Sequence, residues 1–266
     1  MALLVLLRHG ESAWNAEDLF TGWIDAGLSE RGVAQAVAAG KEMASGGMLP
    51  DVVHTSVQRR AIRTADLALE ACGRLWVPVR RSWRLNSNHY GALQGRVKSD
   101  VRAEAGEEQF TRWRRGYHVR PPLGEPDGDP RYAALPLAER PRGESLRDVT
   151  ARLLPYLCDV IVPDLRRHAC VLVVSHGNTL RALVKHLEGV SDEASSALTV
   201  PNAVPLRYDL SLAGSLGRRR GTVADGVLAG PLLTSGVKCS GRRGDDRAGR
   251  PRNGGAGMAA GIRRRP

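Results

Sequence analysis

The sequence predicts an α/β fold in which parallel strands lie buried beneath helices. Residues 3–7 (Leu-Leu-Val-Leu-Leu) and 169–174 (Ala-Cys-Val-Leu-Val-Val) are short runs that are apolar at every position. Strands covered by helices on both faces have this continuous pattern. Each run leads within two residues to a histidine that precedes a glycine, His9 in the first case and His176 in the second. Because ligands bind at the carboxyl ends of parallel strands, we expect both histidines at one site.

The composition is that of an ordinary globular protein, with 266 residues, 42% of them hydrophobic and 25% charged. No apolar run approaches the roughly 18 residues that a membrane span needs, so we expect no membrane partner. The N-terminus has no basic region followed by a long apolar stretch and a small-residue cleavage site. We therefore expect a cytoplasmic protein.

The positive charge is concentrated at the end of the chain. Residues 211–266 hold 12 Lys and Arg against 3 Asp, which accounts for +9 of the net charge of +11. This segment also has 13 of the 30 glycines and no aromatic residue. We expect residues 1–210 to form the catalytic domain and residues 211–266 a disordered Gly/Arg-rich tail. Nucleic acid is an improbable partner, because the tail has no aromatic side chain on which a base could stack.

Helices and strands alternate in the first third of the chain. A helix is expected from about residue 29, with Ser29 as its N-cap. Residues 50–56 predict a short strand and residues 59–69 a helix. Residues 75–79 (Leu-Trp-Val-Pro-Val) are a further strand candidate.

Loops and helices dominate the middle of the chain. Residues 85–95 are polar and interrupted by glycines, which predicts a loop at the same edge of the sheet. Residues 110–115 form an aromatic and basic cluster on a helix. Residues 117–141 are rich in Pro, Gly and Asp, which predicts a long irregular insertion. Residues 144–162 predict an amphipathic helix that Pro155 kinks or breaks.

The strand-end residues together predict a basic pocket. Besides the two histidines it would hold side chains from separate segments, namely Arg8, Arg60, Lys98, Arg114 and Arg115. Guanidinium groups match the oxygens of phosphate and carboxylate in pairs, so the ligand would be a small, multiply charged anion. A neutral imidazole can attack phosphorus and form a phosphohistidine. No Cys/His/Asp/Glu cluster suggests a metal, and no P-loop suggests a nucleotide.

The motifs that carry these residues resemble a known family. Residues 8–11 (Arg-His-Gly-Glu) and 175–177 (Ser-His-Gly) resemble the histidine phosphatase superfamily. Residues 20–23 (Phe-Thr-Gly-Trp), 89–95 (His-Tyr-Gly-Ala-Leu-Gln-Gly) and 113–115 (Trp-Arg-Arg) are similar to its cofactor-dependent phosphoglycerate mutase branch. The similarity extends over about residues 3–210.

The resemblance implies a three-layer α/β/α sandwich with a mostly parallel central sheet. It implies that 3-phosphoglycerate and 2-phosphoglycerate are interconverted, with 2,3-bisphosphoglycerate as the phosphoryl primer and no metal. His9 would be the nucleophile, and His176, Arg8 and Arg60 would stabilise the transferring group. The substrate-binding residues would be Ser12, Asn15, Thr21, Gly22, Ser87, Asn88, His89, Tyr90, Lys98, Arg114, Arg115, Gly177 and Asn178.

Two departures from the family pattern matter. Ser87 and Asn88 stand where the family has Glu-Arg, and that glutamate is the family's proton donor and acceptor. A serine hydroxyl cannot exchange protons near pH 7, and general acid–base help is typically worth about 10²–10⁴ in rate. The second departure is that the family's alanine-rich tail, which helps to close the site, is not found after about Leu210.

Three hypotheses follow from these residues. The first is a phosphoglycerate mutase of glycolysis and gluconeogenesis, weakened by the loss of its acid. The second is a phosphomonoester phosphatase of the same superfamily, and the third a catalytically silent protein that binds phosphorylated metabolites. In all three, the partner is a small phosphorylated molecule, and a homo-oligomer is a further expectation.

Overall fold

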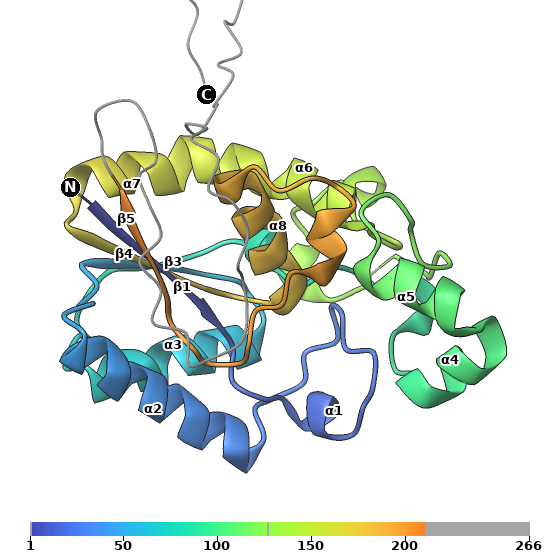
Figure 1. Cartoon of the computed structure of the whole chain (residues 1–266), viewed down its shortest axis with the longest axis horizontal. Helices are drawn as coiled ribbons and strands as arrows, with labels where there is room; N and C mark the ends of the chain where they lie inside the picture. The colour runs from blue at the N-terminus through green and yellow to red at the C-terminus, as the bar shows by residue number, and fades with distance from the viewer. Residues whose placement is uncertain (1, 127, 211–266) are drawn as a thin grey trace, which may run out of the picture.

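A five-stranded sheet forms the centre of the molecule (Figure 1). This computed structural model describes residues 2–126 and 128–210, so the expectation for residues 211–266 lies outside the described residues. The strand order is β3-β2-β4-β1-β5. The strands are β1 (Ala2–Arg8), β2 (Val52–Thr55), β3 (Val79–Arg81), β4 (Cys170–Ser175) and β5 (Leu206–Leu210).

The strands pair in parallel except at one edge, where β5 runs antiparallel to β1. In the pairing of β1 with β4, Leu3 lies opposite Cys170 and Arg8 lies opposite Ser175. The two apolar runs therefore end side by side. This register places the residues that follow them, His9 and His176, at the same edge of the sheet.

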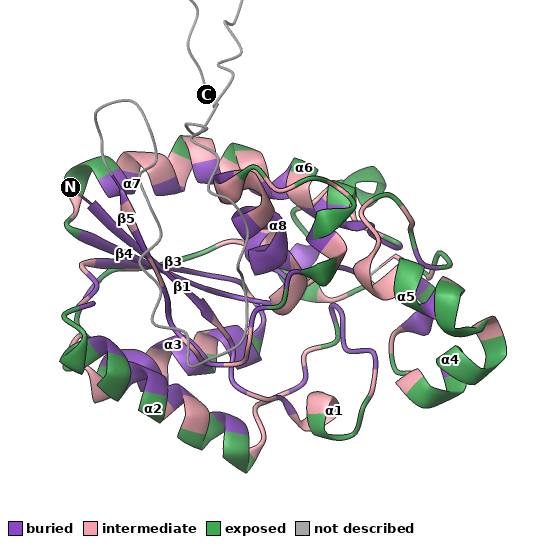
Figure 2. Cartoon of the chain, viewed as in Figure 1, coloured by how far each residue is buried: buried purple, intermediate pink, exposed green. Residues whose placement is uncertain are grey.

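Helices cover both faces of the sheet, which confirms the three-layer α/β/α sandwich (Figure 1). Leu3 and Val5 pack with α2 (Glu30–Ser45) and α3 (Arg59–Ala71). Leu4 and Leu6 face the opposite layer, and Figure 2 shows the central strands buried. Burial of each leucine stabilises the fold by about 1.5–3 kcal/mol. That opposite layer comprises α6 (Leu146–Tyr156), α7 (Val162–Arg167) and α8 (Gly177–Glu188).

The predicted starts of α2 and α3 are confirmed, and Ser29 caps α2 by accepting a hydrogen bond from the backbone of Gly32. The strand predicted over residues 75–79 is misplaced, because β3 begins only at Val79. Pro78 has no N–H to donate to a ladder, and Trp76 is 73% exposed instead of facing a core.

The helix around Pro155 is distorted as expected but not interrupted. α6 passes into a π-helical turn, Leu157–Ile161, which continues directly into α7. Pro155 lies in the last turn of α6 and lacks the N–H that would bond the carbonyl four residues before it.

Short elements surround the carboxyl edge of the sheet. They are α1 (Ala13–Ala16), α4 (Lys98–Ala105) and α5 (Glu107–Arg115). The predicted insertion over residues 117–141 is irregular and contains two 3₁₀ turns, Pro130–Tyr132 and Leu137–Glu139. In the described part of the chain, no helix is long and apolar enough to cross a membrane.

Candidate active site

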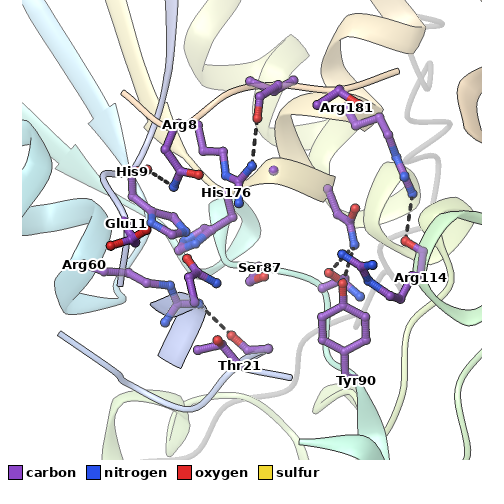
Figure 3. A pocket seen from close by; sticks show the side chains of 18 of the residues that line it. Arg8, His9, Glu11, Thr21, Arg60, Ser87, Tyr90, Arg114, His176 and Arg181 are labelled. Carbon is purple, nitrogen blue, oxygen red and sulfur yellow. Dashed lines mark hydrogen bonds between the residues drawn. The ribbon is translucent and has the colours of Figure 1, made fainter. Parts of the chain in front are cut away.

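A pocket of about 350 Å³ opens at the carboxyl ends of β1 and β4 (Figure 3). Arg8 and His9 enter it from the end of β1, and His176 enters from the end of β4. The backbone N–H of His9 donates to the carbonyl of Ser175 at 2.9 Å. The sheet ladder therefore continues up to the two histidines and holds them together.

His9 is buried and neutral at pH 7. Its Nδ1 lies 2.6 Å from the carbonyl oxygen of Gly10, which accepts a hydrogen bond from that nitrogen. Burial, together with the charges of Arg60 and Arg8, lowers the pKa of His9 well below 6.5. Since Nδ1 carries the proton, Nε2 keeps its lone pair and is available as a nucleophile.

His176 lies beside His9, with 5.0 Å between the ring centroids. Its Nε2 lies 2.8 Å from the hydroxyl of Ser56, whereas its Nδ1 has no hydrogen-bond partner among the described residues. Burial and the charge of Arg60 lower its pKa well below 6.5. A neutral His176 can donate a hydrogen bond to a bound oxygen without repelling the imidazole of His9.

Arg60, at the start of α3, is 1% exposed and is fixed by backbone carbonyls. Its guanidinium donates to the carbonyls of Gly22 at 2.7 Å and Ile24 at 2.8 Å. Gly22 has a φ of 54°, a conformation that favours glycine, and this turns its carbonyl toward Arg60. Burial lowers the pKa of Arg60 to about 10, so it remains a cation.

The guanidinium of Arg8 retains a donor that no protein group uses among the described residues. Its NH1 donates to the carbonyl of Val200 at 2.8 Å, and its Nε has no partner among the described residues. A Cβ on Gly177 would lie 3.3 Å from the guanidinium carbon of Arg8. The absence of a side chain at this position keeps space for the guanidinium.

The structure brings most of the predicted site residues together. The predicted residues that line the pocket are Arg8, His9, Asn15, Thr21, Gly22, Arg60, Ser87, Asn88, Tyr90, Lys98, Arg114, Arg115, His176, Gly177 and Asn178.

Ser12 and His89 do not line the pocket. Ser12 caps α1 by accepting a hydrogen bond from the backbone of Asn15, and is fully buried. His89 is buried against Trp23, and its Nδ1 accepts a hydrogen bond from the backbone of Gly91. We expected direct substrate contact from both side chains; the structure places them outside the pocket lining, with hydrogen bonds to nearby backbone groups.

Cationic side chains on the far side of the pocket are held by separate partners. Lys98 donates to Asp18 at 2.8 Å. Arg115 donates to the carbonyl of Ser196 at 3.1 Å, and the guanidinium of Arg114 lies over the Phe110 ring.

The backbone around Ser87 is firmly anchored. The carbonyl oxygen of Ser87 accepts from Trp23 Nε1 at 2.7 Å and from Arg152 at 2.9 Å, and its N–H donates to Gln58. Arg152 is itself paired with Glu144 at 2.7 Å inside the fold. The position that carries the family's glutamate is therefore rigidly presented to the pocket, with a hydroxymethyl group in place of a carboxylate.

Sequence reasoning missed several residues of the site. Arg181, Asn202 and Glu11 line the pocket, and Ser56 contacts His176 from 120 positions away. Asn202 donates to the carbonyl of His9 at 2.8 Å. Glu11 and Ser56 carried a signal, Glu11 in the Arg-His-Gly-Glu motif and Ser56 in the Thr55-Ser56 pair, which is also similar to the mutase branch.

The pocket fits an anion with more than one charge. Its lining residues in the described ranges include six Lys and Arg side chains and a single carboxylate, that of Glu11. The Nε of Arg8, the hydroxyl of Thr21 and the Nδ1 of His176 are buried and have no hydrogen-bond partner among the described residues. A phosphate group could satisfy them, since unpaired buried donors are costly. No group of His, Cys, Asp and Glu in the same ranges could hold a metal ion.

Comparison with known proteins decides the family. The model of the histidine phosphatase superfamily (branch 1) matches residues 4–209. The chain belongs to this superfamily. The chain is an enzyme of this superfamily. Several of its relatives carry the name 2,3-bisphosphoglycerate-dependent phosphoglycerate mutase.

One such relative, from Streptomyces griseus subsp. griseus, is 59% identical over 213 residues, covering 78% of this chain and 84% of the relative. Another, from Mycobacterium tuberculosis strain H37Rv, is 55% identical over 228 residues, covering 84% and 91%.

Solved structures share the fold. A mycobacterial glucosyl-3-phosphoglycerate phosphatase in complex with VO3 matches with a TM-score of 0.63 and 29% identity, covering 79% of this chain and 93% of that one. YhfR of Bacillus stearothermophilus matches with a TM-score of 0.62 and 24% identity, covering 84% and 96%. The second match shows the fold alone.

Proposed function

We propose that the chain interconverts 3-phosphoglycerate and 2-phosphoglycerate through a phosphohistidine at His9. The observation that supports this most strongly is the buried, neutral pair of His9 and His176 at the base of a strongly cationic pocket. The 54–59% identity to relatives named as mutases favours phosphoglycerates as substrates. We further propose residues 1–210 as the catalytic domain, because the family model ends at residue 209.

The chemistry would begin at His9. Its Nε2 lone pair forms a bond to phosphorus, the ester P–O bond breaks, and the electron pair remains on the ester oxygen. Arg8, Arg60 and the Nδ1–H of His176 would neutralise charge on the phosphoryl oxygens. In the second half, a hydroxyl oxygen of the glycerate attacks the phosphoryl group and the P–N bond to His9 breaks.

The proposed primer is 2,3-bisphosphoglycerate, which when bound supplies the phosphoryl group that loads His9. Orphaned donors on Arg8, Thr21 and His176 would hold one phosphate. Arg114 and Arg115 would hold the group at the other end of the molecule. The many cations of the pocket fit such a polyanion.

Proton transfer is the weak step of the proposed reaction. The ester oxygen must gain a proton as it leaves, and the attacking hydroxyl must lose one. Glu11 is the only carboxylate on the described lining, and its oxygens lie 2.9 Å from the Ser29 hydroxyl and 3.6 Å from Arg31. Since Ser87 cannot exchange protons near pH 7, turnover is reduced by about 10²–10⁴ relative to a chain with the acid.

A phosphomonoester phosphatase is the second candidate. The solved structure with 29% identity favours it, because a protein of the same fold is named as a glucosyl-3-phosphoglycerate phosphatase. Water would then replace the glycerate hydroxyl as the acceptor of the phosphoryl group.

One experiment separates these candidates. The purified full chain is incubated with ³²P-labelled 2,3-bisphosphoglycerate, the label on His9 is mapped, and 3-phosphoglycerate is then added. Appearance of 2-phosphoglycerate supports the mutase, whereas release of inorganic phosphate alone supports the phosphatase. Absence of any label on His9 contradicts both and leaves a phosphometabolite-binding protein.

A further inference from the structure

Arg181 is a buried cation on α8, and no acidic side chain among the described residues forms an ion pair with it. It lines the pocket and is 4% exposed. Its Nε has no hydrogen-bond partner among the described residues, and its NH2 makes one long contact, 3.5 Å to the carbonyl oxygen of Arg114. Within the described residues, the Nε of this guanidinium is therefore unsatisfied and its NH2 is only weakly bonded.

The surroundings of Arg181 are themselves cationic. Burial lowers the pKa of Arg181 to about 10, and repulsion from the positive charges of Arg115 and Arg114 adds to this decrease. The charge of Tyr90 raises the pKa. Arg181 remains protonated at pH 7, so three arginine charges are gathered in one part of the pocket.

Arg152 is a useful comparison, because it is an arginine of similar burial elsewhere in the same fold. It is 7% exposed, yet its guanidinium bonds Glu144 at 2.7 Å and the carbonyls of Arg84 and Ser87. A buried charge without such partners destabilises a protein. The difference indicates that Arg181 is kept for a partner that arrives from outside the chain.

Arg181 lies at the end of the pocket away from the reacting histidine. Figure 3 shows Arg181 and Arg114 together on one side, with His9 on the other. A guanidinium can pair both of its edges with the oxygens of a carboxylate or a phosphate. An anionic group placed there would belong to a ligand whose phosphoryl group lies at His9.

We propose that Arg181 binds the second anionic group of the substrate and selects phosphate esters that carry such a group over esters whose phosphate is their only anionic group. This inference rests on the proposed function and assigns Arg181 a contact with the part of the substrate that does not react.

The test compares Arg181→Met with Arg112→Met, which removes the same charge from α5 at a side chain that is 55% exposed and lies 3.7 Å from Glu108. Binding of 3-phosphoglycerate is measured by calorimetry, and His9 phosphorylation by p-nitrophenyl phosphate is measured in parallel. We expect Arg181→Met to weaken 3-phosphoglycerate binding about 10- to 100-fold and to change the aryl phosphate reaction less than about threefold. Arg112→Met should change neither.

Stability separates a binding role from a structural one. Without ligand, the thermal midpoint of Arg181→Met should equal or exceed that of the wild type, because an uncompensated charge has been removed. If that variant does not fold, Arg181→Lys keeps the charge without the fork and should weaken 3-phosphoglycerate binding about fivefold or more.

Equal binding of 3-phosphoglycerate by the wild type and a folded Arg181 variant overturns this inference and leaves the proposed function standing. Equal weakening of both probes also overturns it, since it would reflect a general loss of positive charge. If the wild type itself binds no 3-phosphoglycerate, the proposed function fails, and this inference fails with it.

Discussion

Two parts of the pocket are both fixed by hydrogen bonds to their backbone, but they differ in the reactive groups that they present. At the strand ends, hydrogen bonds from the backbone and from Asn202 fix His9, and the reactive groups are present. At the loop that carries Ser87, Trp23 and Arg152 fix the backbone just as firmly. That loop presents a hydroxyl where the family has a carboxylate. The contrast teaches that the scaffold of an acid–base residue can remain after its proton-transfer group is gone.

The largest effect is expected at the intact part. His9→Ala removes the nucleophile and should reduce phosphoryl transfer by about 10⁵–10⁶, with no label retained from bisphosphoglycerate. Radiolabel incorporation and coupled turnover measure this. His118→Ala is the control, since that side chain is 61% exposed and outside the pocket. Retained labelling in His9→Ala would show that another residue is the nucleophile.

The next effect tests the defective part. Ser87→Glu should raise mutase turnover by about 10²–10⁴, because the anchored backbone would present a carboxyl group to the pocket. Ser87→Gln is the matched control, having the same size without an exchangeable acid proton. Steady-state rates with 3-phosphoglycerate decide the matter. Equal rates in the two variants would contradict an acid–base explanation.

The scaffold beneath Ser87 can be tested through stability. Glu144→Gln leaves Arg152 as a buried cation without its counter-ion and should lower the free energy of unfolding by about 3–5 kcal/mol. Urea denaturation measures the change. Glu108→Gln changes the same group on the surface of α5, where the ion pair with Arg112 is exposed, and should cost less than about 1 kcal/mol. Similar losses in both variants would mean that the buried pair does not anchor the loop.

The smallest effect is expected when the pH is changed near neutrality, because neither His9 nor His176 should gain a proton there. The pKa values of His9 and His176 lie well below 6.5 because of burial and Arg60, so their NMR signals should not titrate between pH 8 and 6.5. Below 6.5 the unfolded chain binds more protons than the folded one, so the free energy of unfolding should fall as pH drops further. Titration midpoints near 6.5 for both rings would contradict the buried, neutral pair.

The parts of the fold that follow from local pattern were predictable. The apolar runs of β1 and β4 predict parallel strands buried on both faces, and the carboxyl ends of such strands, where His9 and His176 follow, lie at one edge of the sheet. The strand predicted over residues 75–79 was wrong because Leu75 and Trp76 are exposed, and only Val77 and Val79 pack against the core.

The less predictable parts depend on packing between distant segments. Arg181 belongs to none of the motifs identified in the sequence, and the structure buries it on α8, where the charges of Arg114 and Tyr90 act on its pKa. Ser12 and His89 resemble ligand-binding residues by motif, but their polar groups bond to backbone nearby. No local pattern distinguishes these cases.

The central claim is that the loop around Ser87 is fully anchored but lacks the carboxyl group that protonates the leaving oxygen. The most direct test compares two leaving groups. Single-turnover phosphorylation of His9 is measured in the wild type and in Ser87→Glu, with 2,3-bisphosphoglycerate and with p-nitrophenyl phosphate. An alkoxide must be protonated as it leaves, whereas p-nitrophenolate needs no proton. We predict an acceleration of about 100-fold or more by Ser87→Glu for the bisphosphoglycerate and almost none for the aryl ester. Equal acceleration of both, or of neither, would contradict the account.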